Sequence, residues 1–100
     1  MYSTASNIVT KEFKLDIQVL KRFADAFYEN HATKKTHLHL ISRLRWDSFI
    51  KYLNWLQHNR YIECKDVNGV KLYLLTELGR EMFGKLLKFL EISSIQINNF

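Results

Sequence analysis

The sequence contains no proline and only three glycines, at Gly69, Gly79 and Gly84. Because these two residue types mark loops and tight turns, their scarcity favours helices over a loop-rich β-sandwich. The single cysteine, Cys64, excludes a disulfide within the chain and a zinc site built on several cysteines. No apolar run reaches the length of a membrane span, and the first residues lack the apolar segment of a secretory signal. We therefore expect a cytoplasmic protein without a membrane partner.

Acidic residues are scarce in the middle third of the chain, which carries the whole excess of positive charge. Residues 31–60 hold six Lys and Arg side chains and all four histidines against one acid, Asp47, whereas charges balance in the flanking thirds. This asymmetry points to a polyanionic partner. The simpler alternative is a solvated basic face that binds nothing. With 47% hydrophobic residues in 100, the chain can form the core of one domain.

Apolar residues at helical spacing predict three helices in the first 60 residues. The first runs from about residue 15 to 30, with Asp16 in its first turn. The second is short, from about 34 to 41, with Thr33 as its N-cap. The third runs from about 46 to 59 and follows a tight connection. Its apolar arc contains Trp46, so we expect that ring in the core, while Trp55 lies off the arc.

A hairpin is predicted next, because Asn68-Gly69 suits the two positive φ angles of a type I′ turn. A two-residue loop pairs Val67 with Val70 and Asp66 with Lys71, which favours a charge contact across the strands. One face of the hairpin then faces the core and consists of Ile62, Cys64, Tyr73 and Leu75. Cys64 is therefore expected to be a small buried apolar residue.

Thr76 is placed to cap a final helix with apolar residues over about half its circumference. Phe83, Leu87 and Leu90 form one flank, and the opposite flank consists of Leu78, Met82, Leu86 and Phe89. One domain can cover only one flank, so we expect a homodimer through Phe83, Leu87 and Leu90. The competing possibility is that helix 15–30 or residues of the C-terminal tail cover that flank instead. The predicted divisions are an N-terminal extension (1–14), one domain (15–91) and a C-terminal tail (92–100).

The predicted order, helix-helix-helix-strand-strand-helix, is mainly α with a two-stranded β-hairpin wing. A set of residues within 15–91 has a familiar pattern: Lys34, Lys35, Thr36, Leu44, Tyr52, Leu53, Leu56, Leu75, Thr76 and Gly79. In this pattern the chain resembles the small winged helix-turn-helix transcriptional regulators of archaeal type. The resemblance implies a winged-helix fold and double-stranded DNA as partner, and no ligand. The sequence departs from the family at His58-Asn59-Arg60, where Asn59 can supply the left-handed turn conformation.

In a helix-turn-helix, the N-terminal end of the recognition helix enters the DNA major groove. Phosphates there would compensate positive side chains that oppose the helix dipole. We expect Arg45, Asp47, Ser48 and Lys51 to read bases, and Lys34, Lys35, Thr36 and Arg43 to hold phosphates. The wing residues Lys65, Asn68 and Lys71 are further candidates for contact with the backbone or minor groove.

These residues predict a sequence-specific, DNA-binding transcriptional regulator rather than an enzyme, because no catalytic set or phosphate-binding loop is recognisable. His31, His37 and His39 are not spaced as metal ligands, so we expect no metal or cofactor. Two alternatives remain open. Winged helices also serve as protein-interaction modules, and an architectural protein binds DNA with little sequence preference. An acid such as Asp47 near phosphates argues against the architectural alternative.

Overall fold

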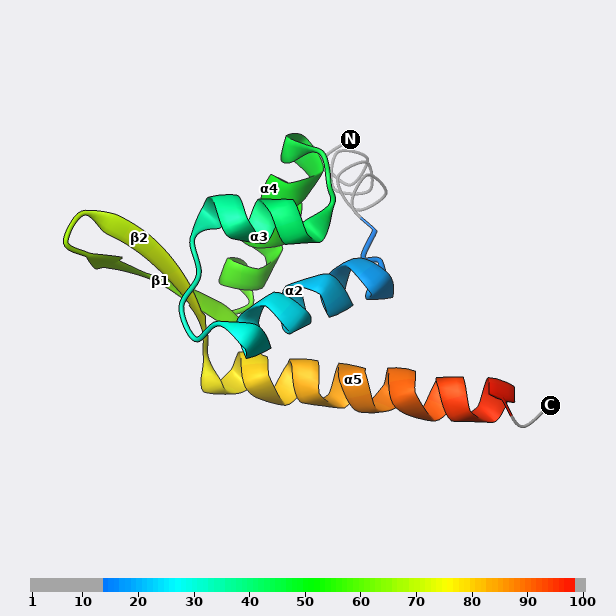
Figure 1. Cartoon of the computed structure of the whole chain (residues 1–100). Coiled ribbons are helices and arrows are strands. Elements are labelled where there is room, and N and C mark those ends of the chain that lie inside the picture. The colour runs from blue at the N-terminus through cyan, green and yellow to red at the C-terminus, as the bar shows by residue number, and fades with distance from the viewer. Residues whose placement is uncertain (1–13, 99–100) are drawn as a thin grey trace, which may run out of the picture.

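The computed structural model describes residues 14–98, with side chains described as far as residue 92. The order of elements is the predicted one: three helices, a two-stranded antiparallel hairpin and a final helix (Figure 1). The elements are α2 (Ile17–Glu29), α3 (Lys35–Ser42), α4 (Trp46–His58), β1 (Ile62–Val67), β2 (Val70–Leu75) and α5 (Glu77–Asn98). Among residues 14–98, no helix combines the length and the apolar character needed to cross a membrane.

The core lies where α2, α4 and α5 meet, and each of these helices contributes a fully buried phenylalanine. Phe23, Phe49 and Phe83 are at most 1% exposed. The rings of Phe23 and Phe49 stack with their centroids 6.0 Å apart, and Leu38 of α3 closes the cluster. Helix α5 starts at the base of the hairpin and runs alongside α2, while the hairpin projects away from the helices (Figure 1). Helices α3 and α4 therefore lie on the side of α2 that α5 does not cover, and the hairpin extends beyond them (Figure 1).

Helix α2 begins at Ile17 rather than at the predicted residue 15, because Asp16 is its N-cap. The Asp16 carboxylate accepts the backbone N–H of Gln18 at 2.8 Å, so the acid precedes the first turn and does not lie within it. The Tyr52 hydroxyl of α4 accepts the Asp16 N–H at 2.8 Å and donates to the carbonyl of Lys14 at 3.1 Å. These bonds fasten the segment before α2 to the predicted recognition helix.

Thr33 is not the N-cap of α3, and that prediction is wrong. Its backbone forms a bridge with Tyr73 of β2, with N–H···O distances of 3.0 and 2.8 Å, and its side chain is buried. The residue therefore serves as a one-residue third strand. The N-cap of α3 is Lys34, which makes no capping bond with its side chain.

Asn59 does not supply the left-handed residue after α4 either. It has φ −86°, whereas Arg60 has φ 62°. The Asn59 side chain instead donates to the carbonyl of Trp55 at 2.8 Å. This bond holds Asn59 against the last turn of α4, so the reversal of the chain falls on the next residue.

The register of the hairpin is the predicted one, with Val67 opposite Val70 and Asp66 opposite Lys71. Both turn residues have positive φ, 53° at Asn68 and 84° at Gly69. The Asp66 carboxylate accepts the Gly69 N–H at 2.9 Å and so fixes the turn. The prediction that Cys64 is buried is wrong, because every residue of β1 after Ile62 is exposed. Tyr73, opposite Cys64, is buried as expected, so only the β1 side of this pair lies outside the core.

Helix α5 is rotated so that the predicted dimer flank faces the interior of its own chain. Phe83 is 0% exposed, so the expectation that it is uncovered is wrong, whereas Leu87 and Leu90 are half-buried. The physical reason is Gly79, one turn before Phe83, where a Cβ would collide with the Tyr61 carbonyl. Only glycine permits this close approach, which turns the Gly79–Phe83 side inward.

The other flank of α5 is exposed only in part, because Met82 and Leu86 are half-buried against the core. Leu78, Phe89 and Ile92 are 50%, 55% and 53% exposed. The helix is capped as predicted, with the Gly79 N–H donating to the Thr76 hydroxyl at 3.0 Å. It continues to Asn98, so most of the segment expected to be a separate tail extends the helix and does not fold back over it.

Candidate nucleic-acid interface

Helix α4 has the two-faced character expected of a recognition helix. Phe49, Leu53 and Leu56 are at most 1% exposed, whereas Asp47 and Lys51 are exposed on the other side. Because the buried face fixes the helix on α2 and α3, the polar face is held rigidly toward solvent. A partner therefore meets a surface whose geometry is set before binding.

The N-terminal end of α4 carries a weakly held charge pair. Arg45 is the N-cap in extended conformation, without a capping bond from its side chain. Its Nε lies 3.9 Å from the Asp47 carboxylate, and these side chains are 90% and 70% exposed. An ion pair this exposed contributes little to stability, so Arg45 can exchange Asp47 for another anion. The positive charge here still opposes the helix dipole, and a phosphate would remove that conflict.

Trp46 lies at the same end and is not part of the core, which corrects the prediction from its helical position. The side chain is 48% exposed. Its ring contacts His39 edge to face at 4.9 Å between centroids, and Lys35 Nζ lies 5.6 Å from the ring centroid. The apolar arc of α4 does include Trp46, but the first turn extends past the body of the domain. The result is a fixed, half-exposed aromatic ring beside a lysine.

The predicted phosphate-binding residues at the start of α3 lie next to this ring. Lys34 and Thr36 are exposed and Lys35 is half-buried against Trp46. The first backbone N–H groups of a helix have no hydrogen-bond acceptor within the helix. In α3 the side chain of the N-cap residue, Lys34, does not accept a bond from them either. The structure thus brings Lys35 against the start of α4, with Lys34 and Thr36 as its exposed neighbours in sequence.

Ser48 and Lys51 line a groove of about 270 Å³ between α4 and the segment before α2. Lys14 lines the same groove, because the Tyr52 hydroxyl holds its carbonyl at 3.1 Å. This brings a further basic residue beside Lys51 that the sequence pattern did not assign to the site. The position of Lys14 depends on its bond with Tyr52, which lies 38 positions away in the sequence. A pattern of neighbouring residues does not reveal such a contact.

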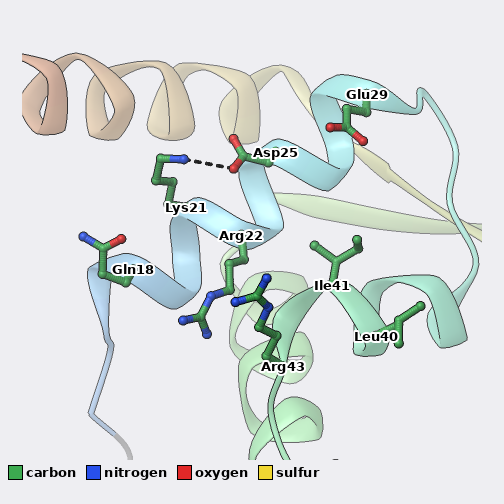
Figure 2. A pocket seen from close by; sticks show the side chains of 8 residues that line it. All are labelled: Gln18, Lys21, Arg22, Asp25, Glu29, Leu40, Ile41 and Arg43. Carbon is green, nitrogen blue, oxygen red and sulfur yellow. Dashed lines mark hydrogen bonds and ion pairs between the residues drawn. The ribbon is translucent and has the colours of Figure 1, made fainter.

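Arg43 stands apart from the other predicted contacts. It ends α3 in the left-handed conformation, with φ 58°. Its side chain lines a groove between α2 and α3, together with Arg22 (Figure 2). The structure therefore separates Arg43 from Arg45, although the two residues are close in sequence.

The three wing candidates, Lys65, Asn68 and Lys71, are exposed on the hairpin. Asn68 shapes the turn with its positive φ, and Asp66 opposite Lys71 balances part of the charge. The wing projects well away from α5 (Figure 1). No group of three His, Cys, Asp or Glu side chains within residues 14–92 is arranged to hold a metal.

Two helices joined by a tight turn, the second with an exposed polar face, followed by a hairpin, define a DNA-binding fold of the helix-turn-helix class. The chain belongs to the winged helix-turn-helix family, whose model matches residues 18–94. This is a class of binding domains, not of enzymes. No curated protein sequence matches the chain significantly.

Solved structures with the same fold include two proteins of low sequence identity. One is a MarR family transcriptional regulator from Silicibacter pomeroyi DSS-3, with TM-score 0.65 and 14% identity over 96% of this chain and 68% of that one. The other is a mutant of the type III plasmid segregation protein TubR, with TM-score 0.59 and 20% identity over 80% of this chain and 97% of that one. At these identities the similarity establishes the fold alone.

Proposed function

We propose that this protein is a sequence-specific transcriptional regulator that places α4 in the major groove of double-stranded DNA, acting in the cytoplasm. The observation that carries the proposal is the charge of residues 31–60, six basic groups against Asp47. Of these, Lys35 and Arg45 lie at the start of α4, and Lys51 lies on its exposed face. The first structural neighbour is itself named a transcriptional regulator, which agrees with the proposal.

Within this proposal, the exposed face of α4 reads bases. Arg45 and Lys51 suit the acceptors of guanine, and Asp47 can accept from cytosine. Ser48 can donate to or accept from either kind of base edge. Lys34, Lys35 and Thr36 hold phosphates on one side of the groove, and Lys14 adds a phosphate contact beside Lys51. Trp46 supplies apolar contact to sugars or thymine methyl groups.

The wing contributes less. Lys65, Asn68 and Lys71 reach the backbone or the minor groove only at the flank of the site, and Asp66 offsets part of their charge. We expect phosphate contact there rather than base recognition.

The regulator is proposed to act as a homodimer through the exposed flank of α5. Leu78, Phe89 and Ile92 are each at least half exposed, and burying each is worth about 1.5–3 kcal/mol. Charges near this flank are of both signs, as in the Lys85–Glu81 pair at 3.3 Å. Two antiparallel copies can therefore meet without repulsion, in an isologous contact. Leu87 and Leu90 would support this contact from the half-buried side of the helix.

The experiment that tests this function is selection of bound sequences from a pool of random duplex DNA. A dimeric regulator enriches a palindrome with half-sites about one helical turn apart. Tight binding without enrichment would overturn sequence specificity and support the architectural alternative. No binding to duplex DNA would overturn the proposal and favour a protein-interaction module.

A further inference from the structure

A groove of about 490 Å³ lies between α2 and α3 (Figure 2). Its lining is polar and charged along α2 and apolar at Leu40 and Ile41 of α3. The guanidinium groups of Arg22 and Arg43 both turn into one part of it (Figure 2). We infer that this groove binds a phosphate group, held between Arg22 and Arg43.

The acids that line the groove do not neutralise these two arginines. Asp25 pairs with Lys21 at 3.0 Å, and Glu29 lies at the far end of α2, about two helical turns beyond Arg22 (Figure 2). The only described bond of the Arg22 side chain is from Nη1 to the Ser42 carbonyl, at 3.0 Å. The Arg43 side chain has no hydrogen bond or ion pair within residues 14–92. Two positive groups thus share a groove with no anion between them, which is unfavourable until one binds.

The backbone supports the same inference, because it holds Arg43 in a conformation that usually belongs to glycine or asparagine. Arg43 has φ 58°, which is strained for a long side chain. Arg22 fixes the neighbouring residue from the other side by binding the Ser42 carbonyl. The turn thus lies beside Arg22, and both guanidinium groups face the groove (Figure 2) with N–H donors that have no described partner within residues 14–92.

Phosphate is the ligand chemistry that fits this arrangement. A guanidinium group offers a planar pair of donors that matches phosphate oxygens, and two such groups match a doubly charged anion. The phosphate can come from the DNA backbone, which rests on the proposed function, or from a small phosphorylated molecule, which does not. The test below separates these sources.

The first arm of the test titrates ¹⁵N-labelled protein with inorganic pyrophosphate and follows the Nε–H signals of the arginines. We expect saturable shifts at Arg22 and Arg43, and at least about tenfold weaker binding in Arg43→Gln, as expected from loss of one charge-assisted hydrogen bond. Arg43→Gln removes an exposed side chain without a described partner, so the fold is retained. Lys88→Gln, which removes the same charge from the exposed surface of α5, is the matched control and leaves binding unchanged.

The second arm measures DNA affinity against salt for the same variants. If the backbone supplies the phosphate, Arg43→Gln and Arg22→Gln each reduce the slope of log K against log salt by about 0.9, and Lys88→Gln does not. Pyrophosphate binding with unchanged slopes identifies a free phosphorylated ligand. The inference is overturned if neither arm responds to the arginine substitutions, or if Lys88→Gln acts as strongly as they do. Wild-type binding to duplex DNA in the same assay shows that the proposed function survives such a failure.

Discussion

Trp46 and Phe89 are two of the large apolar side chains exposed on the surface, and the charges around them differ. Trp46 is 48% exposed, with Lys35 at 5.6 Å from its ring and Arg45 as its neighbour in sequence. Phe89 on α5 is 55% exposed, in a helix that holds as many acidic as basic residues, as in the Lys85–Glu81 pair. Mainly positive surroundings favour a polyanion, whereas balanced surroundings favour another apolar surface. The contrast supports the proposals that DNA is the partner of the first surface and that a second copy of the chain is the partner of the second.

The largest expected effect separates the two phenylalanines of α5. Phe83→Ala should lower the free energy of unfolding by about 3–5 kcal/mol, because the side chain is fully buried. Phe89→Ala should change monomer stability by about 0.5 kcal/mol or less, because its side chain is exposed. Urea unfolding at low protein concentration measures both. Similar losses in the two variants would mean that the two flanks of α5 are not distinct.

The next effect concerns association. Phe89→Glu should convert a dimer to a monomer in sedimentation equilibrium at micromolar concentration, because each flank residue contributes about 1.5–3 kcal/mol when buried. The helical circular-dichroism signal should persist. Leu87→Glu, directed toward the core, should instead reduce that signal. A monomeric wild type would exclude the dimer, and a dimeric Phe89→Glu variant would exclude this flank.

Within the proposed DNA-binding surface, substitutions of Lys51 and Lys35 should affect DNA binding in different ways. Lys51→Ala should weaken binding to the best sequence by about 1–3 kcal/mol and relax preference at one position, because Lys51 is placed to read a base. Lys35→Ala should weaken binding to all sequences alike. Titrations with the selected site and with random duplex measure the difference. Equal losses on both DNAs for Lys51→Ala would mean that it contacts only the backbone.

The smallest expected effect is a change in tryptophan fluorescence when DNA binds. DNA binding should quench the fluorescence of Trp46, which is exposed beside Lys35, and should leave Trp55, packed against Tyr61 at 5.5 Å, largely unaffected. The quenching should disappear in Trp46→Phe and remain in Trp55→Phe. Stability should change by about 1 kcal/mol or less in Trp46→Phe, since an exposed cation–π contact is weak. If the quenching instead disappears in Trp55→Phe, DNA binds on the Trp55 side of α4, which would contradict the proposed interface.

Features encoded in short stretches of sequence could be predicted. Asn68-Gly69 determined the turn and hence every pair of the hairpin, and Thr76 marked the start of α5. The helical period located α2, α3 and α4 to within about two residues. In each case a few neighbouring residues carry the physical cause, so no knowledge of the tertiary structure is needed.

Features that depend on distant contacts could not be predicted. The helical wheel divides α5 into two flanks, but the choice between them depends on Gly79 meeting the Tyr61 carbonyl. The wheel also places Trp46 on the apolar arc without indicating where the body of the domain ends. Lys14 joins the candidate site only through Tyr52. Arg43 leaves the start of α4 because the backbone turns there with positive φ.

The central claim is that the basic surface around α3 and α4 binds double-stranded DNA through its phosphates. The most direct measurement is the affinity for duplex DNA over a range of salt concentrations. With about five to seven phosphates contacted, log K should fall against log salt with a slope of about −5 to −6, from roughly −0.9 for each phosphate. A flat response, or no binding at low salt, would contradict the claim and leave the surface as a site for protein docking.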